Sequence, residues 1–240
     1  MPLVVIPTYD ERENIEVVLD RIRVAVPDAH VLVVDDGSPD GTADLAEAAG
    51  TRLGQIEVLR RSAKGGLGSA YRAGFAHGLA QGHDAFVEMD ADLSHNPDDL
   101  PRLLAALDAG ADLVIGSRYV PGGSIPEWPL HRRLLSRWGN RYVGLVLGLR
   151  VRDATAGFRA YRGSLLEEIE LQETRTNGYA FQVEMTYAAR RAGADIVELP
   201  ISFSDRERGT SKMSGRIVGE AMLAVTWWGV RDRILRRRRR

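Results

Sequence analysis

Two aspartates separated by a single alanine follow an apolar segment of the chain. Asp90 and Asp92 come directly after residues 86–89, which are typical of a buried strand. In an extended chain, residues i and i+2 point to the same side, so the two carboxylates should act together. Hard carboxylate oxygens suit Mg²⁺ or Mn²⁺, which take their other ligands from water and substrate phosphates. We therefore predict a metal site of Asp90, Asp92 and Ser94 that neutralises a departing diphosphate.

Simpler roles are available to several polar residues in this segment. Helix capping fits Asp98 and Asp99 and is open to Asp92, but it explains Asp90 poorly, because a charge that ends so apolar a strand suggests a function. His95 is close enough to complete or orient the metal site, although a single histidine is more often structural than a ligand. The chain has no cysteine, which excludes thiolate ligands.

A second pair of carboxylates follows another apolar run. Asp35 and Asp36 come after residues 31–34 and are followed by a turn and the start of a helix. Carboxylates there can accept hydrogen bonds from ribose hydroxyls or a base edge. Equally, Asp35 or Asp40 can simply cap the helix, and both interpretations stay open. Residues 65–68, Gly-Gly-Leu-Gly, match neither glycine-rich phosphate-binding motif and predict a plain helix-start turn.

Cationic side chains occupy two further polar segments. Arg118 follows the apolar residues 113–115, and Arg206 and Lys212 lie in a loop rich in glycine and serine. Cations on flexible loops suit phosphates that bind and leave. Because a single surface arginine is usually just solvated, these cations indicate a site only in combination with the carboxylates.

The segments that carry these residues alternate in pattern. Short runs rich in β-branched residues precede or follow amphipathic stretches, which predicts an α/β fold with a mostly parallel central sheet and helices on both faces. Ligands bind beyond the carboxyl ends of such strands, so we expect residues 7–11, 35–41 and 90–94 to converge on one cleft. The expected strands are residues 3–6, 31–34, 56–59, 85–89 and 113–115.

The pattern changes after Arg118. We interpret this second half as the acceptor-binding part of the same domain, because 240 residues with 44% apolar content can bury one sizeable core. It contains a loop rich in proline and glycine at residues 121–129, a basic helix from His131, and elements at residues 155–161, 181–192 and 196–203.

Charge is distributed unevenly along the chain. The net charge is −1, yet residues 231–240 hold seven arginines and one aspartate, so the preceding 230 residues carry about −7. The apolar residues 1–7 are too few for a signal peptide and are typical of a strand. We therefore expect the protein to stay in the cytoplasm.

Taken together, these segments resemble the dolichol-phosphate mannose synthases. The resemblance extends over about residues 3–215 in unchanged order, which is more specific than any single motif. It implies an inverting glycosyltransferase of the GT-A fold that uses GDP-mannose, a polyprenyl monophosphate and Mg²⁺ or Mn²⁺. The segments that carry it are Pro7-Thr8-Tyr9-Asp10-Glu11-Arg12-Glu13-Asn14, Asp35 to Thr42, Asp90-Ala91-Asp92-Leu93-Ser94-His95, Gly116 to Tyr119, and Pro200 to Phe203 with Arg206 to Lys212.

The resemblance also implies roles for individual residues. Arg132 and Ser136, four residues apart on one helix face, would meet the acceptor phosphate, and Asp92, Arg118 and Arg132 would contribute most directly to catalysis. Two departures are small: Asp10 stands where asparagine is common, and Ala156 where serine is common. The nucleotide sugar would be bound by Pro7, Tyr9, Glu11, Val34, Asp36, Asp90, Ala91, Asp92, Arg118, Arg206 and Lys212.

The chemistry implied by the resemblance needs no strong general base. A phosphate monoester, with a second pKa of about 6, is already ionised near neutral pH, whereas transfer to a sugar hydroxyl would require a group to take a proton. A single displacement would invert the sugar while Arg118, Arg132 and the metal shield the repulsion between two anions.

The C-terminal residues 216–240 have the pattern of an interfacial helix with a polybasic tail. Only ten uncharged residues, 221–230, lie between charged positions, which is about half of a membrane span. Trp227 and Trp228 would lie at headgroup depth, with Arg236 to Arg240 near anionic lipid. The alternative is a core-packing helix with a solvated or nucleic-acid-binding tail.

We expect residues 1–215 to form the catalytic domain and residues 216–240 to bind the cytoplasmic face of a membrane peripherally. Many similar enzymes have partner subunits, so a separate membrane subunit is a further expectation.

Three other functions fit parts of the sequence. The nearest is a polyprenyl-phosphate glucosyltransferase that uses UDP-glucose, because the physics of the sequence discriminates poorly between epimeric sugars. Only the arginine tail suggests a nucleic-acid partner, and the acidic remainder of the chain argues against one. A catalytically idle scaffold would not explain the joint presence of Asp90, Asp92, Arg118, Arg206 and Lys212.

Overall fold

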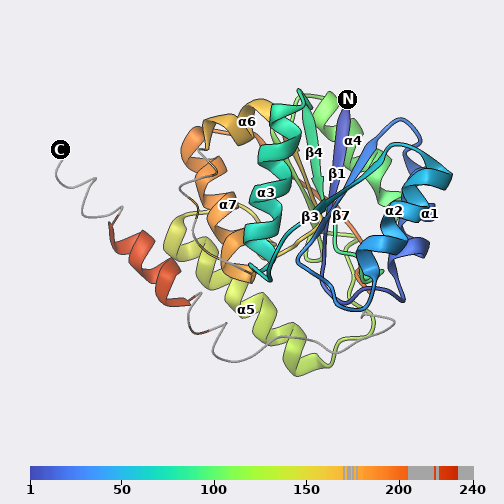
Figure 1. Cartoon of the computed structure of the whole chain (residues 1–240). Helices are drawn as coiled ribbons and strands as arrows, with labels where there is room; N and C mark the ends of the chain where they lie inside the picture. Colours follow the sequence, from blue (N-terminus) through green and yellow to red (C-terminus); the bar gives the residue numbers. More distant parts are fainter. Residues whose placement is uncertain are drawn as a thin grey trace.

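The computed structural model describes residues 1–169, 171, 174, 176, 178–204, 219 and 222–231. Within these residues, one seven-stranded sheet carries helices on both faces (Figure 1). The predicted α/β architecture with a mostly parallel sheet is therefore confirmed. Arg206 and Lys212, which were predicted to bind phosphate, lie outside the described residues, as do Arg236 to Arg240.

The order of the strands decides which loops meet. Along the sheet the order is β3-β2-β1-β4-β6-β5-β7. β6 runs antiparallel to both neighbours, while every other pair is parallel. Six strands consequently end at one edge of the sheet, and β6 begins there. The strands are β1 (Pro2–Thr8), β2 (His30–Asp35), β3 (Ile56–Arg60), β4 (Ala85–Glu88), β5 (Leu113–Ser117), β6 (Arg159–Arg162) and β7 (Ile196–Pro200).

Alternate residues of the central strands face opposite layers of helices. In β1, Val4 and Ile6 pack with α1, α2 and α4, while Leu3 and Val5 pack with α3, α6 and α7. Figure 1 shows these two groups of helices on opposite sides of the sheet. A continuous apolar run suits a strand that is covered on both faces. The helices are α1 (Ile15–Ala25), α2 (Thr42–Leu53), α3 (Leu67–Ala80), the short 3₁₀ helix η1 (Pro97–Asp99), α4 (Leu100–Asp108), α5 (Leu130–Leu147), α6 (Gly163–Glu168) and α7 (Gly178–Ala192).

The five strands expected in the first half are all present, with ends within two residues of those predicted. The basic helix expected from His131 is α5. The sequence did not indicate the direction of β6, which inserts between β4 and β5. That insertion brings the loop before β6 to the edge of the sheet where its neighbours end.

A third apolar cluster lies outside the two main layers. There α5 and α7 pack against a terminal helix at residues 222–231, whose Val225 is buried. Trp228 stacks on Tyr187 with ring centroids 6.0 Å apart, whereas Trp227 is 64% exposed. Trp228 thus packs on the protein, which corrects the expectation that both rings meet lipid. Among the described helices, none combines the length and hydropathy needed to cross a bilayer.

Helix α3 lies so close to the sheet that its glycines Gly74 and Gly78 have no room for side chains. A Cβ atom at Gly74 would lie 2.5 Å from a methyl group of Val5. We expect Gly74→Ala to lower the free energy of unfolding by about 1–3 kcal/mol, because this overpacking outweighs the gain in helix propensity. Gly139→Ala in α5, where nothing lies within 4 Å of the added atom, should be neutral or stabilising. Urea unfolding of both variants measures these free energies. Equal changes in the two variants would contradict the close packing of Gly74 against Val5.

Candidate active site

The predicted site residues are distributed over strand ends at one edge of the sheet. Pro7 lies in β1, Val34 lies in β2, and Asp36 follows β2, while Asp90 follows β4 and Arg118 follows β5. Because these four strands are all parallel, their carboxyl ends meet at the same edge. The fold therefore brings together segments that are more than 100 residues apart in the sequence.

Asp35 holds two of the predicted loops together. One oxygen of its buried carboxylate accepts the N–H groups of Gly37 and Ser38 at 3.1 and 2.9 Å. The other accepts the hydroxyls of Thr8 and Ser38 at 2.8 and 2.6 Å. Asp35 therefore fixes the turn after β2 against β1. Asp40, in contrast, accepts the N–H and hydroxyl of Thr42, the first residue of α2, at 3.0 and 2.6 Å. It supports the helix start from one position before the N-cap, which is Gly41.

Asp36 binds the loop that precedes α3. One carboxylate oxygen accepts from Arg61 at 2.6 Å, and the other accepts the N–H groups of Gly65 and Gly66 at 2.9 and 3.1 Å. The glycine-rich segment is therefore a helix-start turn, as predicted, with Gly66 at a φ of 86°. A ligand that contacts Asp36 would have to share this carboxylate with the protein's own donors.

The other residues predicted to bind the nucleotide differ in what they can offer. Val34 and Ala91 have buried side chains in the core, which leaves only their main chains for a ligand. The ring of Tyr9 is partly exposed and carries the ammonium of Lys64 at 3.6 Å from its centroid. Glu11 accepts from Asn14 at 2.9 Å, next to the start of α1.

The loop after β4 is tightly turned and carries the predicted metal ligands. Leu93 adopts a φ of 62°, and the N–H of Ser94 donates to Asp92 at 3.1 Å. The hydroxyl of Tyr71 donates to Asp90 at 3.3 Å. Burial and the nearby Asp90 carboxylate raise the pKa of Tyr71, so this hydroxyl keeps its proton.

Several observations fit a divalent cation at this loop. The hydroxyl of Ser94 is buried and has no hydrogen-bond partner among the described residues. A methyl group at Gly157 would lie only 3.7 Å from the second oxygen of Asp90, so glycine keeps that side of the carboxylate uncovered. No group of three or more histidine or carboxylate side chains in the described part of the chain is arranged to hold a metal. Two carboxylates are nevertheless enough for a cation that takes its remaining ligands from substrate phosphates and water.

His95 has a structural role. Its Nδ1 accepts the N–H of Asp90 at 3.2 Å, and its ring stacks on Phe158 with centroids 5.0 Å apart. Burial lowers the pKa of His95 to about 4, against the opposing effect of Asp92. The structure therefore confirms the interpretation of His95 as a satisfied structural residue. Asp99 occupies the N-cap position of α4, as expected, but its side chain makes no capping hydrogen bond. The side chain that caps in this segment is Asn96, which accepts the Asp98 N–H at 3.0 Å at the start of η1.

Glu88 and Arg159 form a buried polar centre that the sequence did not indicate. Burial raises the pKa of Glu88 to about 7, although the nearby Arg159 opposes the shift. Arg159 donates to the carbonyls of Ala154 and Ala156 at 2.8 and 2.7 Å. Since a carbonyl makes the contact, the departure of Ala156 from the usual serine leaves this hydrogen bond intact.

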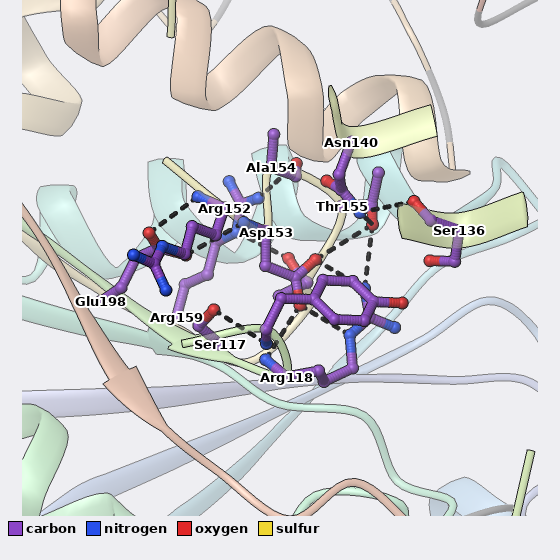
Figure 2. Close-up of polar contacts among 12 residues, drawn as sticks. Ser117, Arg118, Ser136, Asn140, Arg152, Asp153, Ala154, Thr155, Arg159 and Glu198 are labelled. Atoms are coloured by element: carbon purple, nitrogen blue, oxygen red, sulfur yellow. Dashed lines mark hydrogen bonds and ion pairs between the residues drawn. The ribbon is translucent and has the colours of Figure 1, made fainter. Parts of the chain in front are cut away.

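Arg118 is held in place by a buried ion pair. Its Nε and Nη2 donate to the two carboxylate oxygens of Asp153, each at 2.7 Å, and its main-chain N–H donates to the same group at 3.0 Å (Figure 2). Both side chains are at most 5% exposed. Burial alone would raise the pKa of Asp153, but the charge and hydrogen bonds of Arg118 outweigh it and lower that pKa. The guanidinium therefore has a fixed orientation at the end of β5.

Trp128 brings the two predicted catalytic arginines together. The guanidinium of Arg132, on α5, lies 3.8 Å from the centroid of the Trp128 ring, and that of Arg118 lies 5.5 Å from it. Ser136 follows one turn later on α5. Two cations next to one aromatic ring can receive an anion as well as hold each other's position. No role was predicted for Trp128, which lies in the loop rich in proline and glycine.

The fold and this edge of the sheet define a class of protein. A mostly parallel seven-stranded sheet covered by helices on both faces is the fold of the GT-A glycosyltransferases. The model of the family described as glycosyl transferase family 2 matches residues 3–170. The chain therefore belongs to glycosyl transferase family 2.

Two curated relatives are similar over nearly the whole chain. The polyprenol monophosphomannose synthase of Mycolicibacterium smegmatis is 52% identical over 237 residues, which cover 98% of this chain and 89% of that protein. The undecaprenyl-phosphate mannosyltransferase of Micrococcus luteus is 53% identical over 231 residues, which cover 96% of this chain and 95% of that protein. Both names describe transfer of mannose to a polyprenyl phosphate.

A solved structure supports the fold at lower identity. Glucosyl-3-phosphoglycerate synthase from Mycobacterium tuberculosis, in complex with Mn²⁺, UDP and glucosyl-3-phosphoglycerate, aligns with a TM-score of 0.64 at 22% identity. The alignment covers 94% of this chain and 77% of that one. At this identity the likeness shows a shared fold, in a protein whose structure holds a metal ion and a nucleotide.

Removing the charge of Asp153 should be costly. We expect Asp153→Asn to lower the free energy of unfolding by about 3–5 kcal/mol, because the buried charge of Arg118 loses its counter-ion. Asp20→Asn, which removes a surface ion pair with Arg52, should change stability little. Denaturant unfolding near neutral pH tests both variants, and a small loss for Asp153→Asn would contradict a strong pair.

The same pair should give stability a defined pH dependence. The folded pKa of Asp153 lies below its unfolded value of about 3.9, so the contribution is complete above that pH and is lost as the pH falls through the folded value. The stability difference between wild type and Asp153→Asn should therefore narrow below about pH 4.

Proposed function

We propose that this protein transfers mannose from GDP-mannose to a polyprenyl monophosphate with inversion, releasing GDP and polyprenyl phosphate mannose. The observation that carries the proposal is the pair of arginines beside Trp128, at the same sheet edge as the Asp90 and Asp92 carboxylates. This arrangement provides for two anionic groups, one on each side of a transferring sugar. The names of the two curated relatives support mannose and a polyprenyl phosphate, and the family resemblance supports GDP-mannose.

In this proposal, Asp90, Asp92 and Ser94 would hold Mg²⁺ or Mn²⁺, which supplies positive charge to the departing diphosphate. Tyr71 and the turn at Leu93 orient the two carboxylates before substrate arrives. Pro7, Tyr9, Glu11 and the main chain near Val34 would receive the nucleoside, and Arg206 and Lys212 would contact the donor phosphates and sugar.

The family resemblance assigned Arg118 to the donor, but its position beside Trp128 and Arg132 favours the acceptor instead. On the acceptor side, Arg118, Arg132 and Ser136 would therefore bind the lipid phosphate. The acceptor oxygen is already ionised, so the chain's task is to place it in line with the anomeric carbon and to screen its charge. His95 and Glu88 are enclosed in the core, which agrees with a reaction that takes no proton from the acceptor. The fixed direction of Arg118 lowers the cost of organising the site when the phosphate binds.

We further propose that the protein works at the cytoplasmic face of a membrane. The outer side of α5 exposes large apolar side chains, and the terminal helix exposes Leu223 and Trp227 on one face. Residues 1–215 would be the catalytic domain, with residues 216–240 reinforcing contact with anionic lipid and a separate membrane subunit as an additional partner. The exposed apolar residues of α5 are Leu130, Leu134, Leu135, Trp138 and Leu145.

A transfer assay tests the function directly. Purified protein is incubated with radiolabelled GDP-mannose, a short polyprenyl phosphate and Mg²⁺ or Mn²⁺, and label entering the organic phase is counted. We expect metal-dependent transfer that EDTA abolishes and that Asp92→Asn reduces by roughly a hundredfold or more, since one electrostatic stabiliser is lost. The exposed Asp98→Asn is the matched control and should keep full activity.

The choice of sugar donor distinguishes the proposed mannosyltransferase from a glucosyltransferase. Transfer from UDP-glucose but not from GDP-mannose would replace the sugar and support a polyprenyl-phosphate glucosyltransferase. Full activity of Asp92→Asn with unchanged metal dependence would refute the assignment of that ligand.

Membrane contact has its own test. We expect the double variant Leu145→Ser and Trp227→Ser to reduce partitioning onto anionic phosphatidylglycerol vesicles about tenfold, because two large exposed apolar groups no longer insert. Val24→Ser on α1 removes an equally exposed apolar side chain on the far side of the sheet from the terminal helix (Figure 1) and should not change binding. If wild type, the double variant and Val24→Ser sediment equally with the vesicles, the surface that carries Leu145 and Trp227 does not bind the membrane.

A further inference from the structure

A chain of hydrogen bonds connects Arg118 to the helix that carries Arg132 and Ser136. Thr155 accepts from Arg118 Nη2 at 2.9 Å and from Asn140 Nδ2 at 3.1 Å. The same Asn140 nitrogen donates to the carbonyl of Ser136 at 3.1 Å. Figure 2 shows these contacts as an unbroken path from Arg118 through Thr155 to α5.

The donors in this path are fully used, and of the Asn140 amide only the buried oxygen has no partner among the described residues. The Thr155 hydroxyl donates its one hydrogen to Asp153 at 3.2 Å and uses its two lone pairs for Arg118 and Asn140. Both hydrogens of the Asn140 amide are used, one for Thr155 and one for Ser136. Asn140 is only 4% exposed, so water does not compete for these positions.

The far end of the network is anchored in the sheet. Glu198, in β7, accepts the main-chain N–H groups of Arg152 and Asp153 at 2.8 and 3.0 Å. Asp153 is therefore held at its main chain by β7 while its carboxylate holds Arg118. The network joins β7, the loop before β6, the end of β5 and α5.

We infer that Asn140 and Thr155 are positioning residues for the acceptor phosphate. They act by fixing Arg118 relative to Ser136 and Arg132 and do not contact substrate themselves. The inference rests on the proposed function, because it assigns the two arginines and Ser136 to one phosphate. A purely structural hydrogen bond between a loop and α5 would affect stability alone and would not separate one substrate from the other.

The test is kinetic, with both substrates varied. Thr155→Val and Asn140→Ala should each raise the KM for polyprenyl phosphate about tenfold, the scale of one lost hydrogen bond, and leave the KM for GDP-mannose unchanged. Thr155→Ser keeps the hydroxyl and should restore the wild-type value. The double variant should be no worse than either single variant, because both remove the same contact.

A matched control removes a different hydrogen bond to α5. Arg190, in α7, donates to the carbonyl of Leu147 at the end of α5 at 3.1 Å, and Arg190→Met should leave both KM values unchanged. Equal rises in both KM values, multiplicative effects in the double variant, or no rise at all would overturn the inference. If wild type itself transfers no mannose to the lipid, the proposed function fails instead. Thermal unfolding of every variant identifies any that lose their fold. The comparison then uses only the variants that fold, with Thr155→Ser as the one that should keep the wild-type KM for polyprenyl phosphate.

Discussion

The buried ion pair between Arg118 and Asp153 is the interaction on which the second half of the molecule depends. Removing two charges from water is expensive, and apolar side chains of similar size would often stabilise a core as well or better. Both side chains are almost fully buried. The guanidinium of Arg118 donates two parallel hydrogen bonds to the Asp153 carboxylate, and the main-chain N–H of Arg118 donates a third. The main effect of the pair is therefore to fix the orientation of the Arg118 guanidinium.

The first half follows a different design, in which acidic side chains organise the protein itself. Asp35 and Asp36 are adjacent, yet one joins β1 to the turn after β2 and the other binds the start of α3. Main-chain N–H groups at a helix start favour an anion. The loops that would receive the donor are thus held by internal bonds before any ligand binds, which reduces the entropy lost on binding.

Local features of the structure could be predicted from sequence and long-range features could not. The strand runs were clear because continuous β-branched residues suit strands covered on both faces, and Asp90 with Asp92 was recognisable because both lie within one motif. Asp153 was not assigned, because its partner lies 35 residues earlier and the two meet only through the insertion of β6. Trp228 was placed toward lipid because a helix pattern does not reveal which neighbour covers which face. The family resemblance supplied the roles of Arg132 and Ser136, for which the spacing alone gave only a shared face.

The place of β6 in the sheet also has a consequence for biosynthesis. β5 pairs with β6 and β7 only, and both are encoded more than 40 residues further along the chain. Chains are synthesised at roughly 5–20 residues per second. Both edges of β5 therefore stay unpaired for several seconds after β5 has been synthesised. The strands β1 to β4, in contrast, pair among themselves as they emerge. A nascent chain paused between α4 and β6 would therefore present a folded half-sheet and an apolar strand without neighbours, the kind of segment that chaperones bind.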